Sequence, residues 1–111
     1  MIFEPGDLLL IPFPFTDLSS SKRRPVLALT APDSLGDFIG LPVTSRRPTE
    51  HGLPLSGDDL LTGSLPSRSW IRIDRPVSLS GDLVVKVIGR ASGAVRTEAV
   101  RRLCTLLSGA S

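Results

Sequence analysis

Two short basic stretches carry the side chains best suited to chemistry in this sequence. The first, Lys22-Arg23-Arg24, stands directly before Pro25, and the second, Arg46-Arg47, follows Thr44-Ser45. Arginine presents a planar fork of N–H donors that fits phosphate or carboxylate oxygens in a bidentate way. Proline fixes its own φ and biases the preceding residue toward extended backbone, so the backbone of Arg24 is held where a loop becomes a strand and its guanidinium can be aimed at a ligand. These stretches predict a site for anionic groups.

Arginine dominates the basic residues, since eleven of the thirteen Lys and Arg are Arg, although the formal net charge is only +2. This bias favours a nucleic acid or an acidic protein as partner. The single cysteine, Cys104, cannot form an internal disulfide, and its place in an apolar stripe predicts a buried side chain. One Cys, one His and scattered carboxylates show no metal-ligand spacing, so we expect neither a metal nor another cofactor.

The elements that must position these residues are short. Ten prolines and ten glycines in 111 residues favour many turns and one mainly β domain over residues 1–111. Apolar or alternating runs predict strands at residues 8–13, 25–30, 37–45, 69–74 and 83–88, a short extended piece at 51–55 and one helical turn at 58–61. Helical spacing of the apolar residues from Val100 to Leu107 predicts a closing helix, with Thr97 as N-cap and Gly109 as its stop. The sum is a small, strongly twisted antiparallel sheet or barrel whose open face the helix covers.

Strand alternation predicts on which face of the sheet Thr44 lies. In the third strand Ile39, Leu41 and Val43 share one face. If that face packs into the core, Thr44 points away from the core at the end of the strand.

The apolar run at residues 8–15 is short and broken by prolines, so we expect a cytoplasmic protein without membrane spans.

Several segments, taken in order, resemble the MazF/PemK toxins of toxin–antitoxin systems. They are Gly6-Asp7, Phe13-Pro14-Phe15-Thr16-Asp17-Leu18, the stretch from Lys22 to Leu29, Pro42-Val43-Thr44-Ser45, Ser69 and Ile88-Gly89-Arg90. The resemblance implies an SH3-like small antiparallel β-barrel with added helices and a homodimer. It implies a metal-independent endoribonuclease that cuts single-stranded RNA at short sequences. It also implies a cognate antitoxin, whose disordered acidic tail occupies the RNA groove, with operator DNA bound only through the antitoxin complex.

The same resemblance assigns the chemistry to Arg24, directly before the strand proline, and to Thr44, at the end of the next strand. Arg24 would stabilise charge on the phosphoryl oxygens, and Thr44 would hydrogen-bond one of them or orient the 2′-OH. The general base stays open. Further RNA contacts are expected from Phe15 by stacking and from Lys22, Arg23, Ser45, Arg46 and Arg47. Phe3, Phe13 and Trp70 are expected in the core or at an interface.

The residues alone leave other interpretations open. Arg24 can be a solvated surface cation, and Thr44 a β-favouring residue on a strand surface. His51, the only histidine, is a conventional acid–base group but lies in a predicted loop. Two other functions are a non-catalytic SH3-like nucleic-acid-binding module and a gyrase-targeting toxin of related fold. The second is disfavoured because residues 106–111 contain no aromatic side chain.

Overall fold

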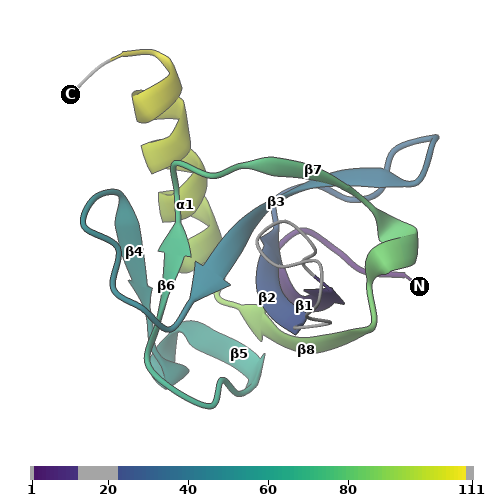
Figure 1. The fold of residues 1–111 in the computed structure, drawn as a ribbon, viewed down its shortest axis with the longest axis horizontal. Helices are drawn as coiled ribbons and strands as arrows, with labels where there is room; N and C mark the ends of the chain where they lie inside the picture. Colours follow the sequence, from purple (N-terminus) through teal and green to yellow (C-terminus); the bar gives the residue numbers. More distant parts are fainter. Residues whose placement is uncertain (1, 13–22, 110–111) are drawn as a thin grey trace.

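The protein folds as a strongly curled antiparallel sheet with one long helix (Figure 1). The computed structural model describes residues 2–12 and 23–109. Within these ranges the elements are β1 (Asp7–Pro12), β2 (Arg23–Ala28), β3 (Asp37–Thr44), β4 (Gly52–Leu55), a 3₁₀ turn (Gly57–Asp59), β5 (Leu60–Gly63), β6 (Ser69–Arg72), β7 (Val77–Ser80), a second 3₁₀ turn (Gly81–Leu83), β8 (Lys86–Ala91) and α1 (Gly93–Leu107). The strand order is β4-β6-β3-β2-β1-β8-β5, with β7 also paired to β3. The predicted mainly β fold with a C-terminal helix is confirmed.

The long strand β3 joins the two halves of the curled sheet. One edge pairs with β2, while the other pairs with β7 along Asp37–Gly40 and with β6 at Val43 and Thr44. Residues 73–76 therefore connect two strands that pair with the same edge of β3. By these registers the connection lies beside the middle of β3, near Gly40 to Pro42.

Both faces of the central strands are buried, which explains the nearly continuous apolar run in β1. One cluster, the helix-side core, contains Leu8, Leu27, Leu29, Leu41, Val43, Leu53, Leu55, Ile71, Ile73, Ala91, Val95 and Ala99. The other, the inner core, contains Phe3, Leu9, Ile11, Val26, Ala28, Phe38, Leu79 and Val84. Alternate residues of β1 and β2 thus enter different cores, and the two strands are held rigidly between them.

The prediction that Ile39 lies on the core face of β3 is wrong, because this residue is 43% exposed. Phe38 is buried instead, with its ring edge-on to Phe3 at a centroid separation of 4.8 Å. Leu41 and Val43 are buried as expected. The strict alternation fails because the first half of β3 buries its Phe38 face in the inner core, and the second half buries the opposite face in the helix-side core.

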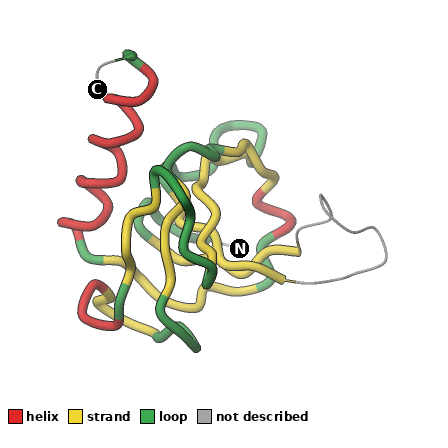
Figure 2. Tube along the Cα trace, turned by 60° about the vertical axis from the view of Figure 1, so that its left-hand side comes forward, coloured by secondary structure: helices red, strands yellow, loops and turns green. Residues whose placement is uncertain are grey.

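The final helix begins earlier than predicted and is less buried. Its N-cap is Ser92, not Thr97, and the Ser92 hydroxyl oxygen accepts the Val95 N–H at 3.3 Å. Cys104 is exposed, contrary to prediction. Only Val95 and Ala99 of α1 are buried, because the second half of the helix extends past the sheet (Figure 2). Gly109 has φ +75° and follows the helix end, as predicted.

The shortest elements also differ from the predictions. The expected strand at 83–88 begins only at Lys86, since residues 81–83 form a 3₁₀ turn capped by the Ser80 hydroxyl. The expected helical turn at 58–61 is a 3₁₀ turn over 57–59 followed directly by β5, and the sequence pattern predicts neither β5 nor β7 as a strand. A strand of four residues has too few alternating positions for the sequence pattern to identify it. No helix in the described ranges has the length and apolar character needed to cross a membrane.

Candidate active site

The register of β2 against β3 brings Arg24 and Thr44 to one place. Val26 lies opposite Pro42 in this pair, and Leu27 lies opposite Leu41. The same register carried two residues further puts Arg24 opposite Thr44, just beyond the last paired residues. Opposed residues of an antiparallel pair project to the same face. Arg24 and Thr44, the two residues predicted to react, therefore project to the same face where the β2–β3 pair ends.

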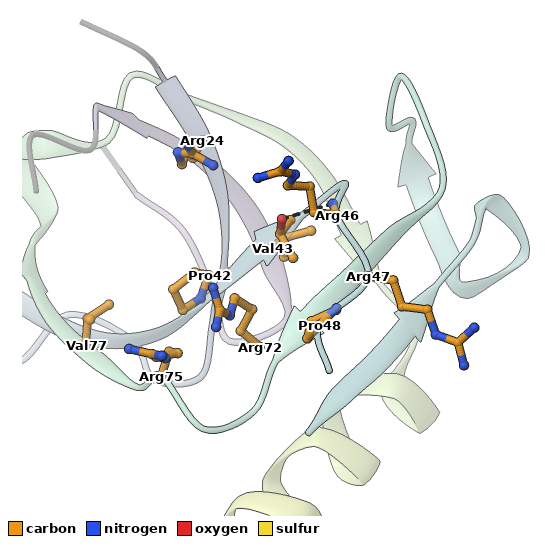
Figure 3. A pocket seen from close by; sticks show the side chains of 10 residues that line it. Arg24, Pro42, Val43, Arg46, Arg47, Pro48, Arg72, Arg75 and Val77 are labelled. Carbon is orange, nitrogen blue, oxygen red and sulfur yellow. Dashed lines mark hydrogen bonds between the residues drawn. The ribbon is translucent and has the colours of Figure 1, made fainter. Parts of the chain in front are cut away.

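Both residues line a pocket of about 510 Å³. Its described lining consists of Arg24, Pro42, Val43, Thr44, Arg46, Arg47, Pro48, Arg72, Arg75 and Val77. Figure 3 shows Arg24 on one side and Arg72 and Arg75 on the other, while Arg47 extends away from Arg24. The pocket contributes five guanidinium groups and, among these lining residues, no carboxylate. We call these five residues the pocket arginines.

The pocket arginines carry uncompensated charge. The ion pairs found in the described part of the chain involve only Arg90, Arg101 and Arg102 on the basic side. The Nε atom of Arg72 is buried without a hydrogen-bond partner within the described residues. Concentrated positive charge in a concave surface attracts anions, and a buried donor gains free energy when a ligand supplies an acceptor. This combination suits the binding of phosphate groups.

Thr44 is held in place by the turn that follows it. Its Oγ1 atom accepts the backbone N–H of Arg46 at 3.1 Å. A hydroxyl has one hydrogen to donate besides its acceptor lone pairs. Because the backbone already supplies a donor to Oγ1, the hydroxyl hydrogen stays available for an acceptor in the pocket. Thr44 is therefore equipped to donate a hydrogen bond to a phosphoryl oxygen.

The remaining predicted contacts fall in three places. Arg46 and Arg47 line the pocket, whereas Arg23 and Ser45 are exposed and do not line it. Phe15 and Lys22 lie outside the described residues.

Two residues named for other reasons lie outside the pocket lining. His51 is exposed, has φ +55° and does not line the pocket. Trp70 was expected in the core or at an interface; it is half-buried and belongs to neither core cluster, so the core position is wrong. Across residues 2–12 and 23–109, no cluster of three or more His, Cys, Asp or Glu side chains could hold a metal ion.

Sequence reasoning missed Arg72 and Arg75 as pocket residues. Burial of Ile71 and Ile73 on alternate positions directs Arg72 to the outer face of β6, and this alternation is visible in the sequence. The neighbour of β6 was not predictable, because its pairing with β3 is a long-range contact. Arg75 reaches the pocket from the connection between β6 and β7.

Comparison with known proteins gives one family and a consistent group of structures. The model of the family described as "PemK-like, MazF-like toxin of type II toxin-antitoxin system" matches residues 4–107. No curated protein matches in sequence. A MazE–MazF crystal structure from Deinococcus radiodurans superposes with a TM-score of 0.75 at 22% identity, covering 100% of this chain and 99% of that one.

Two mycobacterial structures have the same fold. A mycobacterial endoribonuclease in complex with its cognate antitoxin gives a TM-score of 0.74 at 15% identity, over 96% of this chain and 95% of the other. The Mycobacterium tuberculosis toxin MazF-mt6 gives 0.70 at 16% identity, over 95% and 98% of the two chains.

Proposed function

Because this chain belongs to the PemK-like, MazF-like toxins of type II toxin–antitoxin systems, we propose that it is a metal-independent endoribonuclease that cuts single-stranded RNA at short sequences. The observation that carries the proposal is the pocket in which Arg24 and Thr44 meet among four further arginines. The phosphodiester backbone of RNA supplies the negative charge that this lining lacks. The MazF-related structures of similar fold include one described as an endoribonuclease.

The proposed reaction is a transesterification within the RNA strand. The 2′-oxygen attacks the adjacent phosphorus and loses its proton, the bond from phosphorus to the 5′-oxygen breaks, and that oxygen takes up a proton. The products are a 2′,3′-cyclic phosphate and a free 5′-hydroxyl. Negative charge grows on the non-bridging oxygens during attack, and donors placed at developing charge often give the largest catalytic effect. Arg24 supplies two N–H donors there, and the hydroxyl of Thr44 supplies a third.

We assign electrostatic stabilisation rather than proton donation to Arg24. A guanidinium keeps its proton throughout the neutral pH range, so it is a weak acid there. The described pocket lining holds no His, Asp or Glu. Positioning of the phosphate and stabilisation of its charge therefore account for most of the rate enhancement in this proposal.

We further propose that the chain forms a homodimer and binds a cognate antitoxin through the same pocket, reaching operator DNA only in that complex. The relatives of known structure include MazE–MazF assemblies and an endoribonuclease with its cognate antitoxin. Carboxylates bind arginine in the same bidentate geometry as phosphates. An acidic antitoxin segment would therefore compete with RNA for the pocket arginines.

The test is cleavage of single-stranded RNA by the purified protein in the presence of a chelator, with analysis of the ends. We expect 2′,3′-cyclic phosphate ends, and a loss of about 10²- to 10³-fold in rate for Arg24→Ala. Arg102→Ala removes a guanidinium from an exposed face of α1 and serves as the matched control. Full activity of Arg24→Ala would refute the role of Arg24. Binding without cleavage would favour the non-catalytic module, and poisoning of gyrase without RNA cleavage would favour the gyrase-targeting toxin.

A further inference from the structure

We propose that Trp70, together with Arg68, forms a nucleobase subsite next to Thr44. In this subsite the indole ring stacks on the base of a nucleotide adjoining the phosphate held by Arg24 and Thr44. The inference rests on the proposed ribonuclease function and deepens it by naming a residue that selects the substrate.

A row of residues across four strands places Trp70 beside the pocket. Trp70 lies directly opposite Thr44 in the β3–β6 pair and opposite Pro54 in the β4–β6 pair. On the other side of Thr44, the β2–β3 pairing ends at Val26 and Pro42, and its register continued by two residues leads to Arg24. Opposed residues share a face, so Trp70 projects to the face on which Thr44 meets the pocket. The order across the sheet is Arg24, Thr44, Trp70, Pro54.

The opposite face of the same strands is already filled. Val43, Leu53 and Ile71 pair with one another across β3, β4 and β6, and all three are buried in the helix-side core. Trp70 takes no part in either core and is half-buried. The largest side chain of this row therefore stands on the pocket face, where packing of the core does not account for it.

The contact that Trp70 does make is with a cation. The guanidinium carbon of Arg68 lies over the indole at 5.7 Å from the ring centroid, and Arg68 itself is exposed. An aromatic face beside arginine side chains is the combination that single-strand binding proteins use to stack a base and hold its phosphate. An incoming base takes the ring face that Arg68 covers, and the guanidinium then stacks on the far side of the base.

The spacing between the two groups fits a nucleotide. Neighbouring strands lie about 4.8 Å apart, so Trp70 is one strand away from Thr44. A single nucleotide spans that separation between its phosphate and its base. With the phosphate between Arg24 and Thr44, the base attached on the Thr44 side reaches the indole.

The first test uses the emission of Trp70 itself. The chain contains one Trp and no Tyr, so intrinsic fluorescence excited near the indole absorption edge reports Trp70 alone. We would titrate the wild-type protein with 2′-O-methyl nonamers of A, C, G and U, which lack the attacking hydroxyl, and with an abasic nonamer carrying the same phosphates. We expect at least one base-bearing nonamer to quench the emission and to bind about 5- to 100-fold more tightly than the abasic strand. The abasic strand should bind without quenching.

The second test uses substitutions. Trp70→Leu should weaken binding of the quenching nonamer by about 5- to 100-fold, and Trp70→Phe, which keeps an aromatic face, should lose less. Leu61→Ala, which shortens an exposed apolar side chain on β5, is the control and should bind as the wild type does. In cleavage assays Trp70→Leu should raise KM more than it lowers kcat, and should relax the preference for one base next to the cut.

The outcomes separate this inference from the proposed function. If the protein cuts RNA but all nonamers, including the abasic one, change Trp70 emission to the same extent, the proposed subsite is wrong and the proposed nuclease function is kept. If Trp70→Leu binds and selects RNA as the wild type does, the subsite is also wrong. If the protein neither binds nor cuts RNA, both proposals fail. The titration of the wild-type protein tests the proposed subsite even if a Trp70 variant does not fold.

Discussion

Removal of the charges of Arg72 and Arg75 should lower the salt dependence of RNA binding by a calculable amount. For single strands, each neutralised phosphate contributes about 0.7 to the slope of log K against log salt concentration. Five pocket arginines in contact with phosphates would give a slope of about −3.5, and a rise from 50 to 200 mM salt would weaken binding about 100-fold. With Arg72→Gln and Arg75→Gln combined, the slope should become about −2 and the loss about 20-fold.

The measurement is fluorescence anisotropy of a labelled 2′-O-methyl nonamer in 50 to 200 mM KCl. The matched control combines Arg101→Gln and Arg102→Gln, which removes the same net charge from the exposed face of α1. We expect the control to keep the wild-type slope, because a screened charge outside the contact releases no counterion. Equal slopes for the pocket variant and the wild type would refute the assignment of Arg72 and Arg75. A control that changes as much as the pocket variant would show that net charge, and not the pocket, determines binding.

Two further predictions concern single side chains. Thr44→Val should lower kcat by about 10- to 100-fold, because it removes one hydrogen bond to a charged oxygen. Thr44→Ser keeps the hydroxyl and should keep most of the activity. Equal rates for the two variants in the cleavage assay would show that the hydroxyl is not used. The hydrogen bonds from Arg101 and then Arg102 lower the pKa of Glu98 to about 2, so this carboxylate favours the folded state at pH values above its ordinary pKa near 4.5 and loses that contribution as pH falls toward 2. An NMR titration of the Glu98 carboxyl carbon checks this value, and a midpoint near 4.5 would contradict it.

The sequence carried the fold class because its signals were local. Proline and glycine spacing indicated short strands, and the change to helical period after residue 97 indicated the last helix. The position of the Arg24–Thr44 pair followed from strand ends and from a family resemblance. Both residues line one pocket. The catalytic roles of the two residues stay predictions.

What the sequence did not provide depends on long-range geometry. The bend of β3 decides that Phe38 is buried and Ile39 is not, and the bend results from pairing with β7 at one end and β6 at the other. The same pairings bring Arg72 and Arg75 to the pocket. The apolar spacing around Cys104 correctly indicates a helix, but spacing alone does not determine how far the sheet extends beneath that helix.

The unpaired charge of the pocket arginines also bears on the stability of the free protein. Folding gathers five like charges around one concave surface, and their mutual repulsion weakens the folded state. A polyanion that binds the folded chain and not the unfolded one adds about 2.7 kcal/mol of stability at 100 times its Kd. The chain is therefore most stable when its pocket is filled. An acidic antitoxin segment that binds in the pocket as proposed would therefore also stabilise the folded chain, and the free chain should unfold more readily than the complex.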